Sequence, residues 1–113
     1  MATRQGFVVH LSDLSFADEV LAFEGFVLVD FYLASNADCQ REGVVIEEIA
    51  QKYYQRVKVA KLDMEKNPAI TARYRISSVP TLIFFKNGEE MDRVMDFVSE
   101  EELSRYLEKK IKE

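Results

Sequence analysis

Residues 26–33 read Phe-Val-Leu-Val-Asp-Phe-Tyr-Leu and are almost continuously apolar. A run of this kind is typical of a strand that is buried on both faces, as in a parallel sheet. The next stretch, residues 34–38, is polar and typical of a turn. From Cys39 to about Tyr54, apolar residues recur at helical spacing. The sequence therefore predicts a central strand that leads through a turn into a helix.

The predicted helix has one apolar face, which should pack against the sheet. That face comprises Cys39, Gly43, Ile46, Ile49, Ala50 and Tyr53. The polar side chains are expected to point elsewhere, and they are Glu42, Glu47, Gln51, Lys52 and Gln55.

A strand and a helix are predicted before the central strand. Residues 6–11 form a short apolar run and predict an outer strand. Ser15 resembles an N-cap that is followed by Asp18 and Glu19, whose charges suit the start of a helix. We expect Gly25 to end this first helix.

The alternation continues after the central helix. Residues 57–62 predict a third strand, and Asn67-Pro68 opens a short helix with Pro68 in its first position. Residues 81–85 predict a fourth strand, which leads into the strongest hairpin signal of the chain, Asn87-Gly88.

The last two predicted elements are a fifth strand over residues 89–97 and a helix that Ser99 caps. The apolar face of this helix comprises Leu103, Tyr106, Leu107 and Ile111. The full order is βαβαβαββα, which implies parallel pairs with right-handed crossovers and one antiparallel hairpin. We therefore expect a single α/β domain over residues 1–113, with a five-stranded mixed sheet and helices on both faces.

Composition excludes several classes of function. The net charge is -5, and the basic residues are scattered among acidic ones, so nothing predicts a nucleic-acid partner. Cys39 is the only cysteine and His10 the only histidine, so we expect neither an internal disulfide nor a metal site, and no cofactor. The N-terminus lacks the shape of a signal peptide, and no apolar run is long enough for a membrane span, so the expected compartment is the cytoplasm.

The order of elements resembles thioredoxin, and short segments resemble that family in register over residues 6–111. The central strand with Asp30 resembles the strand that leads into the family's active site. Tyr74-Arg75-Ile76, Val79-Pro80-Thr81-Leu82 and the hairpin at Asn87-Gly88 resemble later family segments. The resemblance implies the thioredoxin fold and a cis peptide bond before Pro80.

The chain departs from the family pattern at the expected active site. The family signature is Trp-Cys-Gly-Pro-Cys, and this chain has Ser35-Asn36-Ala37-Asp38-Cys39 in its place. Only the second cysteine remains, so the dithiol motif is degenerate. Val44 takes the place of the family's helix-kinking proline, and Asp96 that of a glycine that lines the substrate groove.

Dithiol reduction needs a thiolate that attacks and a second thiol that resolves the mixed disulfide. Asn36 has no nucleophile, so the family's usual reaction is excluded. A structural interpretation is that Asn36 caps the following helix, with Asp38 in its favourable first turn.

Two residues keep alternative interpretations. Cys39 is either a small buried core residue or a reactive thiol near a helix start. Asp30 takes the family's place for a buried proton acceptor, and we expect burial to raise its pKa. It serves thiol chemistry or is a remnant that pairs with Lys61 or with water.

A binding surface needs no cysteine. By resemblance, the backbone beside Pro80 pairs with an extended peptide, although Pro80 could equally serve only to shape the turn into the next strand. The candidate binding residues are Ser35, Asn36, Ala37, Asp38, Val79, Pro80 and Asp96. Asp38 and Asp96 would favour a basic or more polar partner.

These observations predict a redox-inactive binding or scaffold module with an unidentified polypeptide partner, a monomer or weak homodimer rather than a classical reductase. An alternative is a single-cysteine redox protein in which Cys39 forms a mixed disulfide with glutathione or a partner, in cell redox homeostasis. In a third hypothesis, the protein is a thioredoxin-related redox protein whose activity needs a second thiol from another chain.

Overall fold

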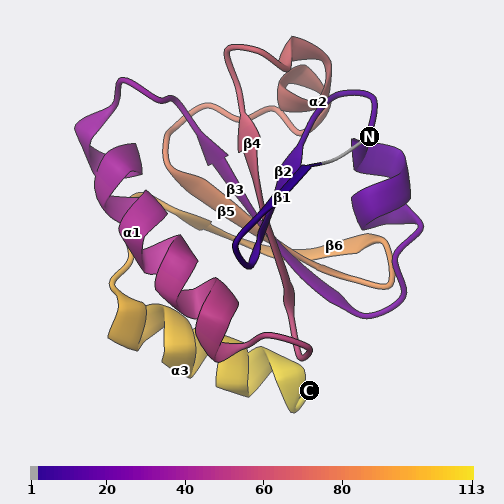
Figure 1. Ribbon diagram of the computed structural model, residues 1–113, viewed down its shortest axis with the longest axis vertical. Coiled ribbons are helices and arrows are strands. Elements are labelled where there is room, and N and C mark those ends of the chain that lie inside the picture. Colours follow the sequence, from indigo (N-terminus) through magenta and orange to yellow (C-terminus); the bar gives the residue numbers. More distant parts are fainter. Residues whose placement is uncertain (1–2) are drawn as a thin grey trace.

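A mixed sheet forms the centre of the molecule, and helices cover both of its faces (Figure 1). The computed structural model describes residues 3–113, with side chains from residue 6 onward. The strands follow the order β1-β2-β4-β3-β5-β6 across the sheet. The strands are β1 (Thr3–Gln5), β2 (Val8–Leu11), β3 (Phe26–Tyr32), β4 (Lys58–Asp63), β5 (Thr81–Lys86) and β6 (Glu89–Met95). The helices are η1 (Ala17–Leu21), α1 (Ala37–Lys52), α2 (Pro68–Arg73) and α3 (Glu100–Ile111). The predicted α/β class and mixed sheet are confirmed.

Strand β3 lies in the middle because its side chains are apolar on both faces. It pairs in parallel with β4 and antiparallel with β5. Residues 27–31 are all buried, which includes the single charged group, Asp30. Strands β5 and β6 form an antiparallel hairpin at one edge of the sheet. Asn87 and Gly88 form the turn of this hairpin, and both have the positive φ that such a turn requires.

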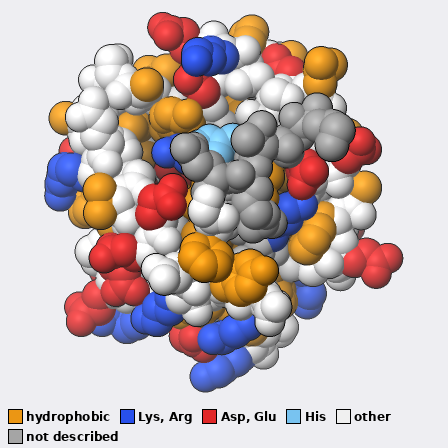
Figure 2. Space-filling view, viewed as in Figure 1, with side chains coloured by type: hydrophobic (Ala, Val, Ile, Leu, Met, Phe, Trp, Pro, Cys, Tyr) orange, Lys and Arg blue, Asp and Glu red, His pale blue; other side chains and the backbone are white. Residues whose placement is uncertain are grey.

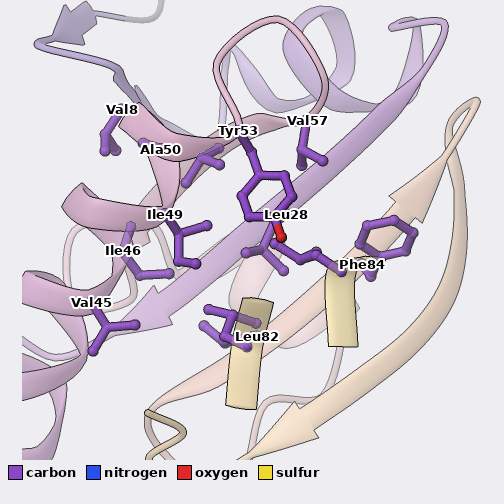
Figure 3. Close-up of a cluster of buried hydrophobic side chains, with 13 residues drawn as sticks. Val8, Leu28, Val45, Ile46, Ile49, Ala50, Tyr53, Val57, Leu82 and Phe84 are labelled. Carbon is purple, nitrogen blue, oxygen red and sulfur yellow. The ribbon is translucent and has the colours of Figure 1, made fainter. Parts of the chain in front are cut away.

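Each face of the sheet has its own apolar core. Figure 3 shows the core beneath α1 and α3, where Ile46 and Ile49 of α1, with Tyr53 just after it, meet Leu28 and Phe84 of the sheet. The opposite core lies beneath η1 and α2 and includes Phe16, Val20 and Ile70. The central strand therefore supports helices on both sides.

The N-terminal part of the chain differs from the prediction. The expected strand over residues 6–11 is two short antiparallel strands, β1 and β2, so the sheet gains a sixth strand. The first helix is a five-residue π-helix, and Ser15 does not cap it. Instead, the hydroxyls of Ser12 and Ser15 accept each other's backbone N–H groups at 3.1 and 2.9 Å. Gly25 does not end this helix, because the helix ends at Leu21.

The two longer helices depart less from their predicted form. Helix α1 begins at Ala37, directly after the cap predicted at Asn36. Glu42 is fully buried, although we expected it on the polar face. Helix α3 begins with a complete capping box between Ser99 and Glu102, as the sequence predicted for its cap. Strand β6 ends at Met95 instead of residue 97, and the next residue, Asp96, has a positive φ.

The surface drawn in Figure 2 carries charged side chains of both signs, and the acidic and basic ones lie interspersed. Among the described residues, no helix has the length and apolar character needed to cross a membrane.

Candidate functional site

The sheet register brings three separate segments to the carboxyl end of β3. Phe31 of β3 pairs with Thr81 of β5, and Thr81 pairs with Met95 of β6. One end of the sheet therefore carries three segments: the turn between β3 and α1, the segment Val79–Pro80 before β5, and Asp96 after β6. Ligands of open α/β sheets usually bind at such an end.

Asn36 starts helix α1. Its backbone is extended, with φ -84° and ψ 129°, and its Oδ1 atom accepts a hydrogen bond from the Cys39 N–H at 2.9 Å. This is the geometry of a helix N-cap, so the predicted structural role of Asn36 is confirmed. Asp38 lies in the first turn and forms an exposed ion pair with Arg41 at 3.0 Å. Part of its negative charge is therefore matched within the helix.

Cys39 is the third residue of α1 and points into the protein, with 4% of its surface exposed. Its Sγ atom accepts a weak hydrogen bond from the Leu33 N–H at 3.5 Å. Burial raises the pKa of the thiol, the Leu33 hydrogen bond opposes this, and the negative charges of Asp30, Asp38 and Glu42 raise the pKa further. The thiol is therefore protonated and shielded at neutral pH, contrary to the needs of a nucleophile.

A pocket of about 260 Å³ lies beside Cys39. Tyr32, Gln40, Gly43 and Lys61 contribute to its lining. The Lys61 ammonium lies 4.4 Å from the centre of the Tyr32 ring. Cys39 therefore borders a pocket that is also lined by the positively charged Lys61, although little of the cysteine itself is exposed.

Asp30 is fully buried, and neither of its carboxyl oxygens has a hydrogen-bond partner among the described residues. Burial raises its pKa from 3.8 to about 7, Lys61 lowers it and Glu42 raises it. The raised pKa agrees with the expectation from sequence. The predicted pairing with Lys61 takes the form of a longer-range attraction, because the described residues include no ion pair between the two groups.

Glu42 is the residue of this region that sequence reasoning missed. Its Oε1 atom accepts a hydrogen bond from the Val98 N–H at 2.8 Å, while its buried Oε2 atom has no partner among the described residues. Burial raises its pKa from 4.5 to about 7. The signal was available in the spacing, because residue 42 is three after Cys39 and four before Ile46, on the same face of the helix.

The remaining candidate residues differ in how far they are exposed to solvent. Ser35, Ala37 and Asp96 are exposed, Val79 is partly buried, and Pro80 is buried. The Val79–Pro80 peptide bond is cis. The Asp96 N–H donates a hydrogen bond to the Pro80 carbonyl at 3.0 Å, which joins the segment after β6 to the segment before β5.

The described part of the chain holds no group of three or more histidine, cysteine or carboxylate side chains that could bind a metal ion. The groups that do come together are a buried thiol and two buried carboxyls, Asp30 and Glu42. The region contains a single thiol, that of Cys39, and therefore cannot form an internal disulfide.

Comparison of the chain with known proteins shows the family to which it belongs. The family model described as thioredoxin matches residues 7–109. "Thioredoxin" of Synechocystis sp. is 41% identical and "Thioredoxin 1" of Nostoc sp. 39% identical, each over 99 residues that cover 88% of this chain and 92% of the relative. "Thioredoxin" of Staphylococcus saprophyticus is 36% identical over 102 residues, which cover 90% of this chain and 96% of that protein. This chain, with its single cysteine at the start of α1, belongs to the thioredoxin family.

Proposed function

We propose that this protein binds an extended polypeptide segment and does not reduce disulfides. One observation carries the proposal: the Asn36 amide accepts the Cys39 N–H at the position where the family signature has its first cysteine. The carboxamide is thus part of a helix cap, and it is not a nucleophile that attacks a disulfide as a thiolate does. With Cys39 buried and its pKa raised, neither of the two motif positions carries an attacking group.

The backbone around Val79 supports the binding half of the proposal. Within the described chain, neither the N–H nor the C=O group of Val79 takes a hydrogen bond. These groups lie just before β5, at the end of the sheet where Asn36 and Asp96 also lie. An extended peptide could pair with them as an added strand does. The exposed carboxylates of Asp38 and Asp96 favour a basic segment.

An assay of insulin reduction tests the redox half of the proposal. With dithiothreitol or thioredoxin reductase as electron source, the wild-type protein should show no turnover above background. Asn36→Cys restores a thiol at the helix start and should yield measurable reduction. Wild-type turnover near that of an ordinary thioredoxin would reject the proposal.

Peptide binding tests the other half. A fluorescent hexapeptide of alternating lysine and valine should bind better than one of alternating glutamate and valine. Asp38→Lys combined with Asp96→Lys should weaken binding of the basic peptide about tenfold or more. The matched control is Glu24→Lys combined with Glu48→Lys, which makes the same charge change away from this end of the sheet. Equal losses in both double variants would show that net charge, and not this surface, determines binding.

A second candidate function is single-cysteine redox chemistry at Cys39, in cell redox homeostasis. The pocket that borders Cys39 and Lys61 favours it, since a small thiol such as glutathione is an anion that Lys61 would attract. The relatives named thioredoxin also support a redox role. The resolving thiol would come from the small molecule or from another chain. For either function, we propose the cytoplasm as the compartment.

A further inference from the structure

Two neighbouring side chains of α1 hold the β6–α3 connection, which comprises residues 96–99. The Glu42 carboxyl accepts the Val98 N–H at 2.8 Å. The Arg41 guanidinium carbon lies 3.9 Å from the centre of the Phe97 ring, in a cation–π contact. Glu42 is fully buried, so its hydrogen bond to the connection is shielded from competition by solvent. Helix α1 therefore fixes the middle of this connection at two successive residues.

The same connection carries Asp96 of the proposed binding surface. The Asp96 N–H donates to the Pro80 carbonyl at 3.0 Å, next to the free backbone groups of Val79. At the other end, Ser99 caps α3 through its capping box with Glu102. A change at the middle of so short a segment should therefore alter the placement of Asp96.

The Glu42 carboxyl lies in a setting where it changes charge around neutral pH. Burial raises its pKa to about 7, the Val98 hydrogen bond and Arg41 oppose that rise, and Glu102 of α3 adds to it. Glu42 also interacts electrostatically with Asp30 of β3 and with the Cys39 thiol. Its Oε2 atom has no partner in the described chain, so Val98 is the single backbone group that responds directly to the charge.

We propose that Glu42 is a positioning residue for the binding surface, and that its ionised form holds Asp96 in the geometry that binds a basic polypeptide. The inference rests on the binding function proposed above. Ionisation makes the Val98 hydrogen bond charge-assisted and therefore stronger. It also adds a negative charge to the side chain that holds the connection on which Asp96 lies. Both effects act in the same direction, so binding of a basic segment should strengthen as the pH rises through the titration of Glu42.

Amide NMR spectra of the free protein, from about pH 5.5 to about pH 8.5, test the positioning without a ligand. The Val98 amide signal should shift as its hydrogen bond strengthens, and the Asp96 and Phe97 signals should shift with the same midpoint. Glu42→Gln keeps an oxygen acceptor but cannot ionise, so it should abolish these shifts. Glu48→Gln, an exposed position on the same helix, should leave them intact. Shifts that persist in Glu42→Gln would overturn the inference.

The fluorescent lysine–valine hexapeptide tests the link to binding. Its affinity for the wild-type protein should rise about fivefold over this pH range, because hydrogen bonds to charged groups are stronger than those to neutral ones. Glu42→Gln should still bind but lose the pH dependence. Wild-type binding that is independent of pH would overturn the inference and leave the proposed function standing. Absence of binding in every variant would reject the proposed function and the role of Glu42 in it, whatever the spectra show.

Discussion

Asn36 and Cys39 lie in the first turn at the start of α1, where the Asn36 Oδ1 atom accepts a hydrogen bond of 2.9 Å from the Cys39 backbone N–H. The cap uses the amide oxygen and a backbone N–H group that could otherwise stabilise a thiolate at a helix start. Three carboxyl groups, those of Asp30, Asp38 and Glu42, further raise the thiol pKa. The local chemistry therefore favours a protonated sulfur that contributes to packing.

Thiol labelling checks this view of Cys39. A bulky maleimide should react slowly with the native protein and much faster in denaturant, because 4% of the residue is exposed in the fold. A small anionic reagent, iodoacetate, serves as the comparison, because the pocket of about 260 Å³ beside Cys39 is also lined by Lys61. Similar rates for the native and unfolded protein with either reagent would favour the single-cysteine function instead.

Single residues also mark where sequence reasoning succeeded and failed. The cap at Asn36 was predictable, because the preference of asparagine for that position is local. The charge of Glu42 predicts an exposed residue, whereas its spacing from Cys39 and Ile46 places it on the buried face of α1. A buried carboxyl is unusual, because burial is costly unless the group is hydrogen-bonded. The hydrogen bond that Glu42 accepts comes from the Val98 N–H, which is distant in sequence, so sequence alone does not predict it.

At the scale of elements, regular patterns were predictable and irregular ones were not. The β3 strand, the Asn87-Gly88 turn and the start of α3 follow from local signals. The π-helix η1 does not, because Ser15 pairs with Ser12 in a turn that propensity alone does not reveal. The short strand β1 is stabilised by pairing with β2, which is a tertiary effect.

The contact between the β5–β6 turn and η1 yields a prediction at this scale. Gly88 has φ +83°, and a methyl group there would overlap the Leu21 carbonyl oxygen. Gly6 also has a positive φ, +63°, but a methyl group at Gly6 would meet only the Glu47 side chain, at 3.8 Å. Gly6→Ala should therefore cost about 1 kcal/mol for its backbone conformation. Gly88→Ala should cost about 2–3 kcal/mol, because overpacking adds to that penalty.

Urea unfolding of the two glycine variants measures this difference directly. The two substitutions make the same chemical change at residues of the same backbone class, so the excess loss in Gly88→Ala isolates the contact with η1. Equal losses would mean that the turn and η1 can separate freely, and that η1 is not held by the hairpin.

At the scale of the whole molecule, the sheet topology was predictable because alternating strands and helices allow few connections. The resemblance to thioredoxin was likewise sufficient for the family. The arrangement of the candidate surface could not be predicted without the register of the strands. Val79 and Asp96 lie far from Asn36 in sequence, and the pairing of β3, β5 and β6 brings all three to one end of the sheet. A partner is proposed here only from exposed charges and free backbone groups, which a core pattern does not constrain.

Two buried carboxyls make the stability of the entire fold dependent on pH. The pKa of Asp30 rises from 3.8 to about 7 and that of Glu42 from 4.5 to about 7. Between about pH 4 and pH 7, the folded protein thus binds more protons than the unfolded chain, so the free energy of unfolding falls as pH rises. His10, whose pKa is lowered, acts in the opposite sense below its ordinary value of 6.5. The two carboxyls should dominate, with a net loss of more than about 1 kcal/mol.

A double-mutant cycle in urea, at about pH 5 and about pH 8, tests both the sign and the coupling. At the higher pH, Asp30→Asn and Glu42→Gln should each reduce the loss seen in the wild type. The Glu42 carboxylate raises the pKa of Asp30, so either substitution also removes the repulsion between the two charges. The double variant should therefore gain less than the sum of the single gains, while Glu48→Gln should behave as the wild type. Additive gains would mean that the two carboxyls titrate independently, and a wild-type protein more stable at the higher pH would contradict the burial of both charges.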